Sequence, residues 1–87
     1  MRLRDEGLSW QEIDGELVIL DLKTSAYLTT NKSGAFLAKL LVEDRHPDEL
    51  VDALVEQYRI DRHRAAADAD AFVQELRRKG LLVEQPT

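Results

Sequence analysis

The pattern of apolar and polar positions predicts two β-strands joined by a tight turn near the start of the chain. The segments LSWQEI (8–13) and ELVILDL (16–22) flank the dipeptide Asp14-Gly15. This dipeptide favours a type I′ turn, because both central positions of such a turn need a positive φ. We therefore expect a two-residue hairpin between these segments.

A third strand follows after a short polar turn. The segment SAYLTT (25–30) is short and rich in residues that favour β structure. The apolar run from Leu17 to Leu20 in the preceding strand is typical of a strand that is covered on both faces. We expect a three-stranded antiparallel meander in which the third strand lies at an edge.

The spacing of apolar residues changes from two to about 3.6 at Asn31, which indicates helices in the rest of the chain. Asn31 is a good N-cap for a helix over 32–43. Pro47 suits the first position of a second helix, where its missing N–H costs nothing. The apolar positions of the first two helices are Phe36, Leu37, Leu40, Leu41, Leu50, Val51, Leu54, Val55 and Tyr58.

A third and longer helix is bounded by clear signals at both ends. Asp61 can cap its first turn, Arg77 to Lys79 fill its last turn, and Gly80 follows. The order of three strands and then three helices predicts an α+β fold, a winged helix-turn-helix. We expect one domain over residues 1–87, with an ordered core over about 8–83.

Composition and charge exclude several classes of protein. A chain of 87 residues holds one modest core and leaves no room for separate cofactor and substrate domains. The 12 basic and 17 acidic side chains give a net charge of −5, whereas phosphate binding needs a positive field. The absence of cysteine excludes disulfides and thiolate chemistry, and it fits a cytoplasmic location. No apolar run approaches the length of a membrane span.

The residues offer little catalytic chemistry. His46 and His63 are the only histidines, and neither has a partner three or four residues away that would complete a metal pair. Asp68 and Asp70 are two apart on a helix, so their carboxylates point away from each other. We expect no enzyme, no cofactor and no metal site.

Two features point instead to binding, although each also has a purely structural interpretation. The segment from Ser25 to Thr30 has no charge or proline, so it is either a short protected edge or a site where an extended peptide can add a strand. The alanines from Ala65 to Ala71 either favour helix and close packing or leave an apolar groove beside the third strand.

The chain resembles the PqqD-like family, the recognition elements for ribosomally made and post-translationally modified peptides. The similarity covers about residues 8–83. It rests on ELVILDL, on Tyr27, Asn31 and Gly34, and on a C-terminal block whose residues follow the family's spacing. That block consists of Asp68, Phe72, Leu76, Gly80, Leu81 and Leu82. The chain departs from the family where Thr30 stands before the asparagine and Ala69 follows the aspartate.

The resemblance implies a domain without catalytic activity that binds the leader of a precursor peptide. The leader would add an antiparallel strand to the third strand, with its side chains in a cleft beside the last helix. The domain would then deliver the precursor to a radical SAM enzyme, a cyclase or a leader peptidase. Stand-alone members occur in the pathway that names the family and in lasso peptide biosynthesis. The expected peptide-binding residues are Ala26, Tyr27, Leu28, Thr29, Thr30, Arg64, Asp68, Ala69, Phe72, Val73 and Leu76.

The pattern of the residues leaves details of this site open. By strand alternation we expect Leu28 to face the helices. Phe72 and Leu76 belong either to the groove wall or to the core.

A winged-helix DNA-binding domain is the alternative function, because the same topology serves that role. Its recognition helix would carry basic side chains, but the second helix carries Asp48, Glu49, Asp52 and Glu56. A small subunit that binds a folded protein is a third hypothesis.

Overall fold

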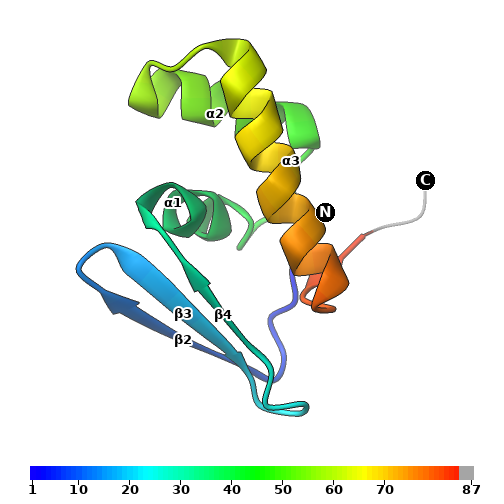
Figure 1. The fold of residues 1–87 in the computed structure, drawn as a ribbon. Helices are drawn as coiled ribbons and strands as arrows, with labels where there is room; N and C mark the ends of the chain where they lie inside the picture. The colour runs from blue at the N-terminus through cyan, green and yellow to red at the C-terminus, as the bar shows by residue number, and fades with distance from the viewer. Residues whose placement is uncertain (85–87) are drawn as a thin grey trace.

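Three antiparallel strands followed by three helices form the main body of the fold, as the sequence predicts. The computed structural model describes residues 1–84 (Figure 1). The elements are β1 (Arg2–Leu3), β2 (Leu8–Ile13), β3 (Glu16–Asp21), β4 (Tyr27–Thr30), α1 (Lys32–Leu40), α2 (Pro47–Tyr58), α3 (Arg62–Arg78) and β5 (Leu82–Val83). The single domain expected over 1–87 includes residues 85–87, which lie outside the described part.

The main sheet has the strand order β2-β3-β4, so β2 and β4 are its two edges. Asp14 (φ 54°) and Gly15 (φ 82°) form the expected turn between β2 and β3. The prediction that β3 is covered on both faces is wrong. Leu17 and Ile19 are buried, whereas Leu20 on the opposite face is 36% exposed. Alternate positions of a strand point to opposite sides of the sheet. The apolar run from Leu17 to Leu20 therefore places apolar side chains on the exposed face of β3 as well as on its buried face.

Local capping bonds set the starts of the helices. The Asn31 Oδ1 accepts a hydrogen bond from the Gly34 N–H at 2.9 Å at the start of α1. The Asp61 carboxylate accepts bonds from the first N–H groups of α3, at 3.1 and 3.3 Å. α2 begins at Pro47, as expected, and the N–H of the preceding His46 donates to the Glu49 carboxylate at 3.0 Å.

The first helix is shorter than the sequence predicts. It ends at Leu40 and not at residue 43. The carbonyl of Leu41 instead accepts a hydrogen bond from the N–H of Leu3 at 2.8 Å, and the Arg45 N–H donates to the carbonyl of Met1 at 2.8 Å. The N-terminal segment thus forms hydrogen bonds with backbone groups of the residues that follow α1.

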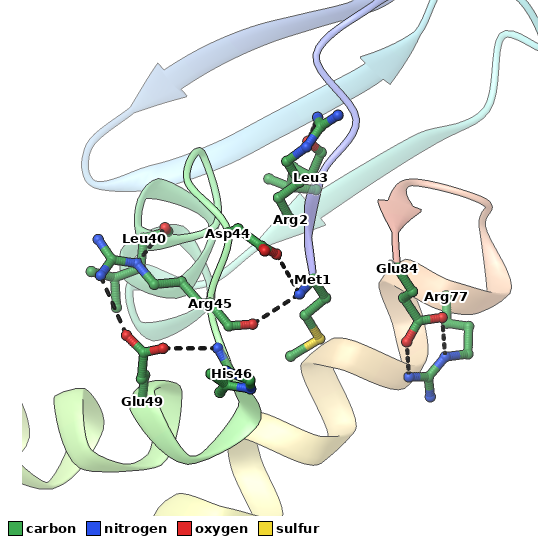
Figure 2. A network of polar contacts seen from close by, with 10 residues as sticks. All are labelled: Met1, Arg2, Leu3, Leu40, Asp44, Arg45, His46, Glu49, Arg77 and Glu84. Atoms are coloured by element: carbon green, nitrogen blue, oxygen red, sulfur yellow. Dashed lines mark hydrogen bonds and ion pairs between the residues drawn. The ribbon is translucent and has the colours of Figure 1, made fainter. Parts of the chain in front are cut away.

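A second sheet of two short strands joins the beginning of the chain to the residues after α3. Arg2 lies opposite Val83 and Leu3 opposite Leu82. The side chain of Leu3 is 2% exposed and belongs to the main core. Figure 2 shows the Met1 ammonium between the Asp44 carboxylate, at 2.6 Å, and the Arg45 carbonyl, at 3.0 Å. Residues before position 8 thus also pack against the core, and strands of two residues give no periodic signal in a sequence.

Candidate functional site

The free edge of β4 presents the backbone groups of Tyr27 and Thr29. The N–H of Asp21 donates to the Ala26 carbonyl at 2.8 Å, in the same register that pairs Ile19 with Leu28. In an antiparallel pair the hydrogen-bonded positions alternate. Ala26 and Leu28 therefore bond toward β3, whereas the N–H and C=O of Tyr27 and Thr29 point away from the sheet.

Residues of β4 and α3 line a groove between these two elements. Figure 1 shows β4 as the strand of the main sheet that lies toward α3. The groove consists of two cavities of about 440 and 460 Å³ that share Leu28, Thr29 and Glu75. We call the two together the β4–α3 groove. Its lining residues are Ser25, Ala26, Tyr27, Leu28, Thr29, Thr30, Asn31, Ser33, Gly34, Leu37, Arg64, Asp68, Ala71, Phe72, Glu75 and Lys79.

Apolar side chains line the middle of the groove, and charged side chains follow its α3 rim. Leu28 and Leu37 are buried and Phe72 is half-buried. Along α3 the rim pairs Arg64 with Asp68 at 3.7 Å and Glu75 with Lys79 at 3.8 Å. These opposite charges balance, so the charged α3 rim of the groove has no net charge.

Gly34 lets α1 and β4 approach closely at one end of the groove. A Cβ at this position would lie 2.9 Å from the Thr30 Cβ and 3.3 Å from Cε1 of Phe72. The Thr30 hydroxyl in turn accepts a hydrogen bond from the Leu17 N–H at 3.3 Å. The departure from the family at Thr30 therefore places a polar group on the β3 side and leaves the apolar middle of the groove intact.

Comparison with known proteins assigns the family. A family model described as coenzyme PQQ synthesis protein D (PqqD) matches residues 16–82. The chain belongs to the PqqD family. No curated protein matches this PqqD family member.

Two solved structures resemble this PqqD family member over nearly its whole length. One is TbiB1 in complex with the TbiA(beta) leader peptide, with a TM-score of 0.84 and 32% identity over 100% of both chains. The other is a lasso peptide synthetase B1 complexed with the leader peptide, with a TM-score of 0.79 and 26% identity. That match covers 95% of this chain and 96% of the other.

Most of the residues expected from the sequence meet in the β4–α3 groove of this PqqD family member. They are Ala26, Tyr27, Leu28, Thr29, Thr30, Arg64, Asp68 and Phe72. Leu28 faces the helices as expected and is buried. Of the two residues that could belong to the groove wall or to the core, Phe72 lines the groove and Leu76 is fully buried in the core.

Three expected residues do not line the groove. Leu76 lies in the core, while Ala69 and Val73 line a separate cavity of about 230 Å³ beside α2. Each helical residue turns the side chain by about 100°, so these positions lie about a quarter turn or more away from the groove face. The small Ala69 therefore does not widen the groove. Ala65 and Ala69 are buried in the core, and of the alanines that begin α3 only Ala71 lines the groove.

Several groove residues are absent from the sequence-based site. They are Asn31, Ser33, Gly34, Leu37, Ala71, Glu75, Lys79 and Ser25. Helical spacing alone would have found those of α3, because Glu75 and Lys79 continue the face of Arg64, Asp68 and Phe72. Leu37 could not be found in this way, because only the packing of α1 on the sheet brings it into the groove.

A hydrogen-bonded aspartate lies beside one end of the groove. Asp21, whose side chain is 3% exposed, accepts the N–H of Lys23 at 2.9 Å and contacts Arg4 at 2.5 Å. The Lys23 bond and then the Arg4 guanidinium lower the pKa of the Asp21 carboxyl. Within residues 1–84 no three acidic or histidine side chains gather as metal ligands, and no helix has the length and apolar character that crossing a bilayer requires.

Proposed function

We propose that this PqqD family member binds the leader of a ribosomally made precursor peptide as an added strand on β4. The free backbone groups of Tyr27 and Thr29 beside the β4–α3 groove carry this proposal. Both similar structures are described as complexes with a leader peptide, which supports the same role here. Main-chain pairing supplies affinity, and leader side chains at alternate positions enter the groove and supply selectivity.

The chemistry of the groove favours a peptide over duplex DNA. Its middle is apolar, and its α3 rim sets Asp68 and Glu75 between Arg64 and Lys79. DNA phosphates need a surplus of cations, which neither this rim nor the acidic α2 offers. The family and the two similar structures give no support to the alternative winged-helix DNA-binding function.

The domain then presents the bound precursor to a separate enzyme and performs no chemistry itself. The groove side chains include no histidine or cysteine that would act as a base or nucleophile. The likeness to a lasso peptide synthetase B1 favours the leader peptidase or the cyclase of a lasso peptide pathway over a radical SAM enzyme as the partner.

Replacing Thr29 with proline tests the added strand directly. The Thr29 N–H points away from β3, so Thr29→Pro removes an outward donor and keeps the β3 ladder. Losing one net hydrogen bond and leaving a leader carbonyl unpaired costs about 2 kcal/mol or more. We expect the Kd for the leader to rise at least about ten-fold. Fluorescence anisotropy with a labelled synthetic TbiA(beta) leader peptide, the peptide found in the similar TbiB1 complex, measures it.

A proline on the opposite edge of the sheet is the matched control. The Leu22 N–H donates to the Gly7 carbonyl at 2.7 Å, and the register of this pairing turns the Glu12 N–H outward from β2. Glu12→Pro should leave the Kd unchanged. Thr29→Ala keeps the backbone donor and should raise the Kd far less than Thr29→Pro does. Unchanged leader binding by a Thr29→Pro variant with a native circular dichroism spectrum would contradict strand addition.

A further inference from the structure

One ion pair ties the two walls of the β4–α3 groove together at the end where β4 begins. Arg4 follows β1, and its backbone N–H donates to the carbonyl of Leu81 at 2.9 Å. Leu81 is buried, and its own N–H donates to the Leu76 carbonyl in the last turn of α3, also at 2.9 Å. The backbone of Arg4 is therefore fixed to the end of the helix that forms one wall.

The side chain of Arg4 reaches the opposite wall. Its Nη2 lies 2.5 Å from the Asp21 Oδ2 at the end of β3. The other carboxylate oxygen of Asp21 accepts the Lys23 N–H, and the backbone of Asp21 bonds to Ser25 and Ala26 at 2.8 Å each. Asp21 thus holds the whole turn that leads into β4.

This turn forms the end of the groove itself. Ser25 has φ +63°, a left-handed conformation that a serine adopts only when surrounding contacts hold it. Ser25, Ala26 and Tyr27 line the same cavity as Lys79, the C-cap of α3. The series of bonds from α3 through Leu81, Arg4 and Asp21 to Ser25 therefore spans the groove and meets both of its walls.

We infer that the Arg4–Asp21 pair is a positioning element for leader binding, which sets the distance between β4 and α3 at this end of the groove. The inference rests on the proposed function. The opposite end is fixed differently, because β4 runs through Asn31 directly into α1 and the backbone of Gly34 lies close to Phe72. Without Arg4, the β3–β4 turn loses its tie to α3, and the groove is held at one end only.

The contact depends on a single donor nitrogen. Arg4 is 26% exposed and Asp21 3% exposed, so the pair is shielded from water. The Arg4 Nε is buried without a hydrogen-bond partner among the described residues. A lysine ammonium can therefore replace the guanidinium at Asp21, whereas a methionine of similar length cannot.

Two measurements test the inference, one of them without any peptide. The chain has no cysteine, so K23C and R78C give unique spin-label sites on the β3–β4 turn and on the last turn of α3. We expect one narrow distance distribution in the parent protein, a broader one with Arg4→Met, and recovery with Arg4→Lys. The Kd for the labelled leader should rise about ten-fold with Arg4→Met, since only a fraction of molecules then holds a competent groove.

Arg77 offers a matched control at the same end of α3. Its guanidinium donates to both oxygens of the Glu84 carboxylate, at 2.5 and 3.2 Å. This pair does not reach the main sheet of β2, β3 and β4 (Figure 2). Arg77→Met should change neither the distance distribution nor the Kd. If Arg4→Met does not fold, Arg4→Leu combined with Asp21→Asn removes the buried charge as well as the pair, and the same broadening and ten-fold loss are expected.

The outcomes separate this inference from the proposed function. A parent protein that does not bind the leader would overturn the proposed function, while the distance measurement would still report on the ion pair. A folded Arg4→Met variant with an unchanged distance distribution and an unchanged Kd would overturn the inference. Equal losses with Arg4→Met and Arg77→Met would also overturn it, because they would show a general loss of stability.

Discussion

Replacing Gly34 with alanine sets two opposing effects against each other at the end of the groove. Alanine in a helix normally gains about 0.5–1 kcal/mol over glycine. Here the new Cβ would lie 2.9 Å from the Thr30 Cβ, 3.3 Å from the Phe72 ring and 3.4 Å from the Asn31 Oδ1. The first distance is shorter than real Cβ contacts, and Thr30 is held by its pairing with Leu17.

Overpacking of this kind costs about 1–3 kcal/mol, so it exceeds the gain in helix propensity. The Asn31 oxygen cannot retreat without weakening the cap of α1, and any shift of the Phe72 ring changes the groove that it lines. We expect Gly34→Ala to lower the free energy of unfolding by about 1–2 kcal/mol. For a domain of this size each kcal/mol corresponds to about 4–8 °C in Tm.

Urea denaturation followed by circular dichroism measures the change, with an unchanged m-value as the sign that two-state unfolding persists. Lys32→Ala, at the exposed first position of α1, is the control and should change the free energy by less than about 0.5 kcal/mol. A Gly34→Ala protein as stable as the parent, or more stable, would refute the argument from close approach.

Two further predictions concern the N-terminal segment and acid. Leu3→Ala should lower the free energy of unfolding by about 2–5 kcal/mol in a urea titration, because Leu3 is 2% exposed in the core; a change below about 0.5 kcal/mol would show that this segment does not pack as described. The lowered carboxyl pKa of Asp21 means that the unfolded state binds more protons, so the stabilisation is present above the unfolded pKa and is lost as pH falls through the folded one. The free energy of unfolding of Asp21→Asn should therefore fall less than that of the parent protein between pH 5 and pH 2. If the free energies of the two proteins fell in parallel with pH, Asp21 would not be the group that titrates.

Local signals in the sequence predict where the helices start, and they do so because capping is a local interaction. The side-chain oxygens of Asn31 and Asp61 accept hydrogen bonds from the first turns of α1 and α3, and Pro47 suits the first position of α2. The predicted starts of the helices therefore agree with the structure. The end of α1 depends on residues far away in the sequence, because the carbonyl of Leu41 accepts a hydrogen bond from the N–H of Leu3. No window of sequence around α1 contains that information.

The candidate site shows the same division. The edge strand with Leu28 facing the helices follows from alternation and strand order alone. The residues expected from the sequence include Ala69 and Val73, but helical phase turns these two toward α2. Residues from other elements, such as Leu37, enter the site only through the packing of α1 against the sheet.

The pairing of β1 with β5 also bears on the order in which the molecule folds. β2, β3 and β4 pair with their neighbours in sequence, and α2 packs on the helix that follows it. Such short-range contacts form early, because little chain entropy is lost in closing short loops. Arg2 and Val83, by contrast, meet only after nearly the whole chain has come together. We expect hydrogen exchange to show that the β1–β5 ribbon forms last and opens first, so that sheet and helices exist before their relative position is fixed.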